Sequence, residues 1–194
     1  MSRGLYCPFT WRFLMNNLAK SCGILGLVFL TSCGMRGEPG ETAHEQITTS
    51  PGAEIVGCGE VEGAVSTRTV EAPDTALGYV NVMPELETPA FKPGCPNIEA
   101  KLGTRFGVRV VARGAAGSIV PLVTRVTHPE IRNPENAQTT TVDQWSSPMN
   151  SGIPRYAGWS FDKPWELVAG RWRIEILDAA NKVLAAQDFS VTVK

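Results

Sequence analysis

The sequence predicts an all-β fold, an antiparallel β-sandwich that follows an export signal and a polar tether. Three observations predict it. Short segments of alternating apolar and polar residues recur after residue 53, turn-forming residues separate them, and no segment combines helical periodicity with helix caps. The 194 residues include 19 Gly and 14 Pro, which suits a turn-rich β protein. Apolar residues at 43% and charged residues at 19% are typical of a globular chain.

The first element is a short apolar segment, CGILGLVFL, at residues 22–30. A membrane-spanning helix needs about twenty apolar residues, so this segment is too short to be a stable anchor. It matches the apolar region of a secretory signal, and Arg3, Arg12 and Lys20 supply the positive charge that precedes such a region. Met15 is an alternative start, because the chain from Met15 onward still contains a complete signal.

The end of this segment, LTSC at residues 30–33, resembles the lipobox of bacterial lipoproteins. The resemblance implies cleavage before Cys33, diacylglyceryl attachment to its sulfur and acylation of the new amine, for example with palmitate. An ordinary cleaved signal with an incidental cysteine is the alternative. Gly34 after the cysteine favours the outer membrane, with the protein facing the periplasm. The predicted organisation is a signal at 1–32, the lipidated cysteine and a flexible tether at 33–52, and a sandwich at 53–194.

The cysteines that remain form an even pair. Cys7 and Cys22 lie in the signal and Cys33 carries lipid, which leaves Cys58 and Cys95. An exported domain lies in an oxidising compartment, so we expect a disulfide between them that closes a loop of about 37 residues. Two free buried cysteines are the alternative.

The charge balance argues against one class of partner. Lys and Arg number 18 and Asp and Glu number 19, a formal net charge of −1. Nucleic-acid binding requires a dense basic patch, and the sequence contains none.

Each strand of the predicted sandwich is identified by its alternation. Phe106, Val108 and Val110 alternate with other residues along one strand, and Trp172, Ile174 and Ile176 along another, as expected for half-buried strands. Pro121 places its strand at a sheet edge or makes it a strand start. The predicted strands are residues 53–63, 77–86, 106–114, 118–129, 156–162, 171–179 and 183–194. The predicted connections include a polar loop at 64–76, a loop at 130–140, a connection at 163–170 and a hairpin turn at 179–182.

Aromatic residues are concentrated in one part of the chain. Between residues 156 and 172 lie Tyr156, Trp159, Phe161, Trp165 and Trp172, and Trp145 precedes them. We assign Trp159, Phe161 and Trp172 to the core. Tyr156, Trp165 and Trp145 are candidate surface anchors for a glycan or a protein.

Arg105 and Arg109 are further candidate binding residues. They alternate on one strand and could hold a carboxylate or a sugar through paired hydrogen bonds. Two outward, solvated arginines are the alternative.

No catalytic constellation is evident. There is no Gly-x-Ser-x-Gly motif, no Gly-rich phosphate loop and no cluster of metal ligands. His128, at a predicted strand end, is expected to cap a turn or face solvent. Asp162 and Glu166 could be paired carboxylates, but we favour turn capping by Asp162 and a surface ion pair by Glu166. We therefore predict no catalytic residues, no metal and no cofactor.

Three segments resemble a bacterial family known as domain of unknown function 3859. They are IEAKLGTRFGVRV (98–110), YAGWSFDKPWELVAGRWRIEIL (156–177) and LAAQDFSV (184–191). The family pairs a Leu-Gly-Thr-Arg-Phe-Gly stretch with a Trp-Glu-Leu-Val-x-Gly-x-Trp stretch and a final Phe-x-Val strand. The resemblance implies an exported domain with an immunoglobulin-like sandwich over roughly residues 53–194. It supplies no activity and no catalytic residues.

These inferences predict a lipoprotein of the bacterial envelope whose sandwich binds a partner and performs no catalysis. The partners would be the membrane, through acylated Cys33, and a protein or glycan of the envelope. Two alternatives remain. One is a small envelope hydrolase that uses Asp162, Glu166 or His128, and the other is a structural subunit of an envelope complex.

Overall fold

The structure is a computed structural model that describes residues 52–84 and 87–194. The predicted signal, the lipidation site Cys33 and most of the tether lie outside the described residues. The elements, in chain order, are β1 (Gly52–Glu60), β2 (Arg68–Glu71), β3 (Tyr79–Val82), β4 (Asn97–Ala100), β5 (Arg105–Arg113), β6 (Ile119–Val120), β7 (Leu122–Arg132), β8 (Thr139–Ser146), β9 (Met149–Asn150), β10 (Pro154–Ser160), the 3₁₀ helix η1 (Pro164–Glu166), β11 (Gly170–Asp178) and β12 (Val183–Val193).

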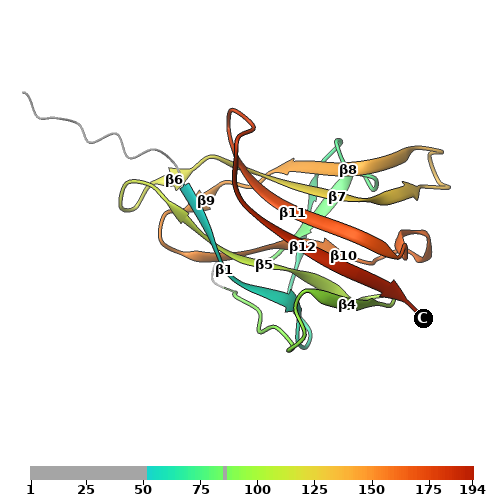
Figure 1. Ribbon diagram of the computed structural model, residues 1–194. Coiled ribbons are helices and arrows are strands. Elements are labelled where there is room, and N and C mark those ends of the chain that lie inside the picture. The colour runs from blue at the N-terminus through green and yellow to red at the C-terminus, as the bar shows by residue number, and fades with distance from the viewer. Residues whose placement is uncertain (1–51, 85–86) are drawn as a thin grey trace, which may run out of the picture. The chain divides into compact units, whose positions relative to one another are not determined.

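Two sheets form the sandwich (Figure 1). One has the strand order β1-β5-β10 and the other has the order β4-β12-β11-β7-β8. Neighbouring strands are antiparallel except β4, which pairs with β12 in parallel. Two further two-stranded sheets, β2-β3 and β6-β9, form small ribbons that are separate from these two. The predicted all-β sandwich is confirmed, and the parallel strand β4 is an addition to it.

Aromatic rings fill the centre of the core. The Phe106 ring lies 5.6 Å from Phe161, 5.6 Å from Trp172 and 5.1 Å from Phe189, measured between ring centroids. These four side chains are at most 2% exposed. The alternation predicted for β5 and β11 holds, because Phe106, Val108 and Val110 on one strand and Trp172, Ile174 and Ile176 on the other are all buried.

The predicted loop at 130–140 is shorter in the structure, because β7 continues to Arg132 and β8 begins at Thr139. Pro129 lies inside β7, where the register with β8 shifts between Thr127 and Ile131. A bulge accommodates a proline within a sheet, since the missing N–H then breaks no regular ladder.

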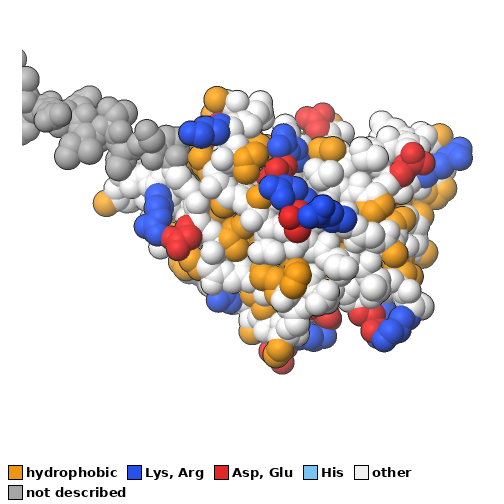
Figure 2. All heavy atoms as spheres, viewed as in Figure 1, with side chains coloured by type: hydrophobic (Ala, Val, Ile, Leu, Met, Phe, Trp, Pro, Cys, Tyr) orange, Lys and Arg blue, Asp and Glu red, His pale blue; other side chains and the backbone are white. Residues whose placement is uncertain are grey.

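Charged side chains cover the outer face of the larger sheet. Glu175 accepts hydrogen bonds from Arg125 at 2.7 Å and from Arg173 at 3.1 Å, and Arg173 also pairs with Asp188. Figure 2 shows Lys and Arg interleaved with Asp and Glu over β11 and β12. This face is therefore solvated and balanced in charge.

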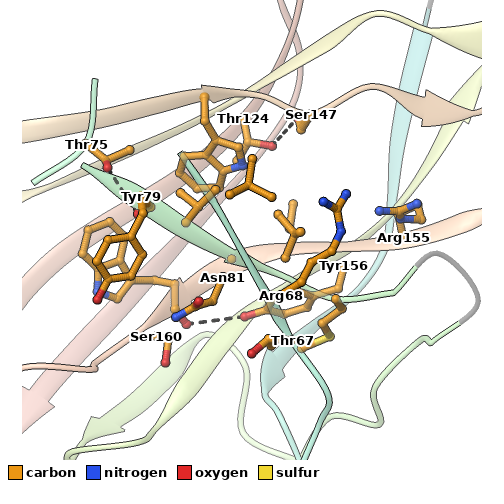
Figure 3. A pocket seen from close by; sticks show the side chains of 18 of the residues that line it. Thr67, Arg68, Thr75, Tyr79, Asn81, Thr124, Ser147, Arg155, Tyr156 and Ser160 are labelled. Atoms are coloured by element: carbon orange, nitrogen blue, oxygen red, sulfur yellow. Dashed lines mark hydrogen bonds between the residues drawn. The ribbon is translucent and has the colours of Figure 1, made fainter. Parts of the chain in front are cut away.

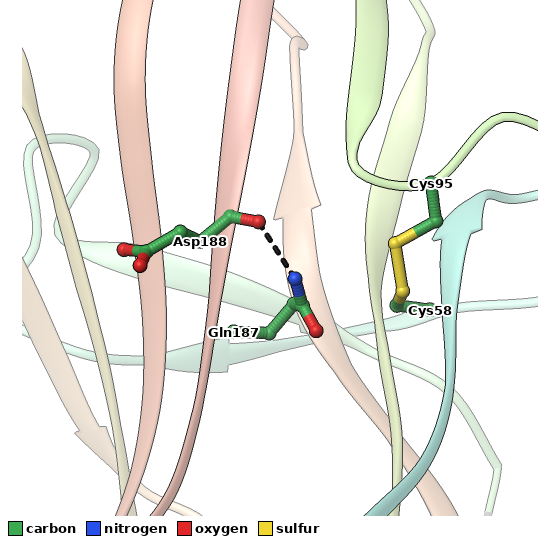
Figure 4. Close-up of a disulfide and its surroundings, with 4 residues drawn as sticks. All are labelled: Cys58, Cys95, Gln187 and Asp188. Atoms are coloured by element: carbon green, nitrogen blue, oxygen red, sulfur yellow. Dashed lines mark hydrogen bonds between the residues drawn. A yellow bond between two sulfur atoms is a disulfide. The ribbon is translucent and has the colours of Figure 1, made fainter.

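A disulfide joins the two sheets at one edge of the sandwich. Cys58 on β1 is bonded to Cys95, which precedes β4, with the Cα atoms 5.9 Å apart (Figure 4). Strands β1 and β4 are the outer strands of their sheets on this side. The predicted Cys58–Cys95 bridge is confirmed, and it closes this edge covalently.

Candidate functional site

The opposite edge of the sandwich, between β10 and β8, is covered by the β2–β3 hairpin. Two side chains hold the hairpin turn at Ala76. Asp143 Oδ2 accepts a hydrogen bond from Ala76 N at 2.9 Å, and the Asn133 amide donates one to Ala76 O at 2.9 Å. Strand β3 is held by Asn81, whose amide donates to Asp162 at 2.9 Å. Side chains and turn backbone, and not a shared β-ladder, therefore attach the hairpin to the sandwich.

A cavity of about 630 Å³ lies beneath the hairpin. Its walls come from both sheets, from η1 and from the β2–β3 and β6–β9 ribbons, and they include Val80, Met83, Trp145 and Met149 together with several charged groups. Figure 3 shows Tyr79 and Thr75 at one side of it and Arg68 and Arg155 at the other. Cavities of a few hundred Å³ with mostly apolar walls and a few polar groups are the usual form of small-molecule sites.

Glu166 is an acid on the inner wall of this cavity and is fully buried. Its Oε2 accepts hydrogen bonds from the backbone N–H groups of Asp162 and Lys163, both at 2.7 Å, while Oε1 has no partner. The pKa of Glu166 is raised to about 7, chiefly by burial and to a smaller extent by the negative charges of Asp162 and Asp143, while the two N–H groups act to lower it.

A comparison with Glu175 shows that this environment is unusual within the same fold. Both glutamates are buried. Burial alone would raise the pKa of Glu175, but hydrogen bonds from Arg125 and Arg173 lower its pKa below the ordinary value. Among the described residues no cationic side chain hydrogen-bonds to Glu166, whose carboxylate receives only the two backbone N–H groups.

A buried histidine lies beside the second inner acid. His128 Nε2 is 3.6 Å from Asp143 Oδ1, and neither atom has a hydrogen-bond partner. The histidine ring also packs against Trp159 and Trp172, with centroids 5.3 and 5.0 Å away. The expectation that His128 caps a turn or faces solvent is therefore wrong, because the alternation of β7 directs it into the core.

The expectation for Glu166 is also wrong, and that for Asp162 is changed. Glu166 forms no surface ion pair but is buried and caps η1 through backbone N–H groups. Asp162 accepts hydrogen bonds from Ser160 Oγ at 2.6 Å and from Asn81, so it holds the hairpin as well as its own turn.

Tyr156 lies flat against the outer face of the smaller sheet. Its hydroxyl donates to Phe106 O at 2.8 Å, and burial raises the pKa of this phenol above its ordinary value. The ring fits because Gly107 and Gly158 have no side chains, since a Cβ at Gly158 would lie 2.3 Å from the Tyr156 hydroxyl. Tyr156 is therefore fixed in place as part of the cavity wall.

The structure brings together three of the five candidate binding residues. Tyr156, Trp145 and Arg105 line the cavity. Arg109 lies outside the cavity lining, where it donates to Pro89 O at 2.7 Å and lies over the Phe91 ring. Trp165 also lies outside it and packs, half-buried, against the core. A binding role for these five residues stays a prediction.

Sequence reasoning missed Asp143, Asn81 and the entire hairpin contribution to the site. One signal was present in the chain. Leu122, Thr124, Val126 and His128 alternate, and this period places His128 on the same buried face as the others. Asp143 gave no comparable signal, because an inward polar residue resembles an outward one in sequence.

The described residues show neither a metal-ligand cluster nor a membrane-spanning helix. Within that part of the chain no three His, Cys, Asp or Glu side chains are close enough together to hold a metal ion. Residues 52–84 and 87–194 also include no helix of the length and apolarity needed to cross a membrane.

Comparison with solved structures identifies a similar fold. The chain is similar to an immunoglobulin-like protein from Pseudomonas aeruginosa, with a TM-score of 0.50 and 18% sequence identity. The match covers 75% of this chain and 99% of the other. At this identity the similarity concerns the fold, which is immunoglobulin-like.

Comparison of the sequence itself gives one significant result. None of the curated proteins is significantly similar to the chain. The family model described as domain of unknown function (DUF3859) matches residues 63–191, which include the hairpin, the cavity and both sheets except β1. The chain therefore belongs to the DUF3859 family.

Proposed function

We propose that the protein is a lipid-anchored module of the bacterial envelope that captures a ligand in the cavity beneath the β2–β3 hairpin. The observation that carries the binding role is the cavity itself. It is of small-molecule size, and its lining combines apolar side chains such as Val80 and Trp145 with charged groups such as Arg105 and Glu166. Space of this size, lined by apolar side chains and a few charged groups, is typical of small-molecule sites.

The lipid anchor rests on the LTSC sequence before the domain. Several acyl chains hold a protein stably in a bilayer, because each buried methylene contributes about 0.8 kcal/mol. The Cys58–Cys95 disulfide supports export, since such bridges persist in oxidising compartments such as the periplasm. The outer membrane, with the domain in the periplasm, is the proposed location.

The anchor is tested by metabolic labelling with an alkyne fatty acid. The wild type should be labelled and Cys33→Ser should not be labelled. Equal labelling of the two proteins would contradict the anchor.

The binding role is tested in intact cells with a photocrosslinking amino acid. Thr67 lines the cavity and is exposed, whereas Leu102 is 56% exposed and lies outside the cavity lining. We expect an adduct from position 67 that position 102 does not form. No adduct at position 67, or the same adducts at both positions, would argue against capture in this cavity.

A hydrolase is the second candidate function, because Glu166 has a pKa of about 7 and lies in a cavity with Asp143 and Asp162. A group with a pKa near the working pH is suited to proton transfer. We favour binding because Asp143 and Glu166 each use one oxygen to hold backbone, and His128 faces Asp143 and not a serine. Chemical change of the captured ligand by the wild type, but not by Glu166→Gln, would instead support the hydrolase.

A further inference from the structure

The cavity beneath the hairpin has a cationic side. Arg68 on β2 and Arg155 on β10 both line the cavity, and Figure 3 shows the two at the same side of it. One comes from the hairpin and the other from the smaller sheet, so the packing of the hairpin on the sandwich brings them together. A guanidinium group stays charged throughout the ordinary pH range, and this side of the cavity therefore attracts anions.

The acids of the cavity belong to its other side, where Figure 3 shows Thr75 and Ser160. Asp143 accepts a hydrogen bond from the backbone of the residue that follows Thr75, and Asp162 accepts one from Ser160 Oγ at 2.6 Å. Glu166 in turn accepts the backbone N–H of Asp162 at 2.7 Å. Each acid holds part of the fold at that side, and the two signs of charge are separated across the cavity.

Arg68 has no anionic partner in the described part of the chain. It is exposed, and its guanidinium forms no ion pair or hydrogen bond with any described residue. By contrast, Arg113, Arg125 and Arg173 each pair with a glutamate. An arginine without a carboxylate partner can bind an external carboxylate or phosphate through two parallel hydrogen bonds.

Apolar side chains adjoin this cationic side. In the β2–β3 ladder Arg68 is opposite Val82 and Val70 is opposite Val80, and all four residues line the cavity. Opposite residues and residues two apart share one face of a β-ribbon, so the arginine and the three valines lie on the same face of the hairpin. The valines also line a smaller adjoining hollow together with Trp145, which places this ring against the same face.

We propose that the cavity binds an anionic amphiphile, which carries a carboxylate or phosphate on an apolar chain. The anionic head lies between Arg68 and Arg155, and the chain lies against the valines and Trp145. A purely apolar ligand would cover Arg68 without a counter-ion, and a cationic ligand would add a further positive charge. This inference rests on the proposed function, that the cavity is a ligand site, and it adds the chemical class of the ligand.

The test measures binding to the full chain, purified from cells in an uncharged polyoxyethylene detergent, by saturation-transfer NMR and calorimetry. The anionic probes are hexanoate, which represents a fatty acid, and hexyl phosphate, which represents a phospholipid. Hexanol and hexylammonium carry a similar chain with no charge or with the opposite charge, and inorganic phosphate carries the charge without the chain. We expect one of the two anionic six-carbon probes to bind about tenfold more tightly than these three controls, and the tighter of the two identifies the source.

Arg68→Gln is the decisive variant. It keeps a polar side chain at an exposed position, so the fold is retained, and it removes the charge. The affinity for the anionic probe should fall about tenfold or more, because hydrogen bonds between charged groups are the strong ones. Arg155→Gln should weaken binding in the same direction while the far-ultraviolet spectrum stays unchanged. Arg132→Gln is the matched control, since Arg132 is an exposed strand arginine outside the cavity lining, and it should bind like the wild type.

Three results would overturn the inference. They are binding of hexanol or hexylammonium as tightly as the anionic probes, binding of inorganic phosphate as tightly as hexyl phosphate, and unchanged affinity of both cavity variants for the anionic probes. If no anionic probe binds but photocrosslinking from position 67 succeeds, the ligand class is wrong and the proposed function stands. If both experiments fail, the proposed function is wrong as well.

Discussion

The two edges of this sandwich are closed in different ways. At the β1–β4 edge the Cys58–Cys95 disulfide links the sheets, and both cysteines pack against the core. At the β8–β10 edge a hairpin is held over a cavity by a few polar contacts, chiefly those of Asn81 and Asp143. The first arrangement maximises burial and covalent restraint. The second leaves buried polar atoms of Asp143 and Glu166 without hydrogen-bond partners, which costs stability.

The difference separates the edge that is restrained covalently from the edge that contains a cavity. Sites that must bind are drawn from the less stable parts of a structure, because they need space and unpaired groups. The buried glutamates follow the same division, since Glu175 is neutralised by two arginines and Glu166 is not. Four measurements test this difference between the two edges.

The largest effect is expected in the aromatic core. Phe106→Ala removes a fully buried ring in contact with three others and should lower the free energy of unfolding by about 3–5 kcal/mol. Trp145→Ala, at the cavity wall, should cost only about 1–2 kcal/mol, because its side chain is half-buried and loses less contact on truncation. Urea denaturation of both variants measures the difference. Equal losses would show that the cavity wall is packed as tightly as the centre of the core.

The disulfide is expected to have the next largest effect. Cys58→Ala/Cys95→Ala opens a loop with a sequence separation of 37 residues. On the chain-entropy model this should cost about 3–4 kcal/mol of unfolding free energy. The wild type should lose the same amount on reduction, whereas the double variant should be unaffected by reductant. A loss below about 1 kcal/mol would mean that packing alone closes this edge.

The buried acid of the cavity should make stability depend on pH. The pKa of Glu166 is raised from 4.5 to about 7 in the folded protein, so the folded state keeps a proton that the unfolded state has lost over this range. Stability contributed in this way is present below pH 4.5 and is lost as the pH rises to 7. The total loss is on the order of 3 kcal/mol.

Denaturation of the wild type and Glu166→Gln at pH 5 and at pH 8 tests this prediction. The variant cannot ionise, so it should gain stability relative to the wild type as the pH rises. Taking the difference between the two proteins removes the contribution of all other titrating groups. A difference that stays constant from pH 5 to pH 8 would contradict the raised pKa.

The strands that the sequence predicted well are those with one apolar face. Phe106, Val108 and Val110, and likewise Trp172, Ile174 and Ile176, alternate strictly, and all six are buried. Strand β2 could not be found this way, because RTVE contains a single apolar residue and lies mostly exposed. Strand β8 does not show an apolar alternation either, since the buried residue at the middle of the strand is Asp143.

The site was harder to predict than the fold for a related reason. Its walls come from residues between 67 and 166, and only the tertiary packing of the hairpin on the sandwich brings Asn81 to Asp162 and Asp143 to Ala76. The expectations for His128 and Glu166 were wrong because a lone histidine or glutamate near a strand end is usually exposed to solvent, whereas these two are buried. The disulfide was predictable, since counting the cysteines beyond the predicted signal and lipobox left a single pair, Cys58 and Cys95.

The smallest effect concerns the attachment of the hairpin. Asn81→Ala removes the hydrogen bond to Asp162 and a second one from Thr69, and each is worth about 1 kcal/mol in net stability. Because these bonds fasten the hairpin and not the core, the loss should be local. Amide hydrogen exchange should therefore accelerate in residues 68–82, while exchange in β5 and β11 stays as slow as in the wild type. Asn136→Ala, which removes an exposed amide that bonds to Gln138 in the loop before β8, is the matched control and should leave residues 68–82 unchanged. Faster exchange across both sheets of the Asn81 variant would mean that the hairpin is part of the cooperative core, and the β8–β10 edge would then be as firmly closed as the disulfide-linked one.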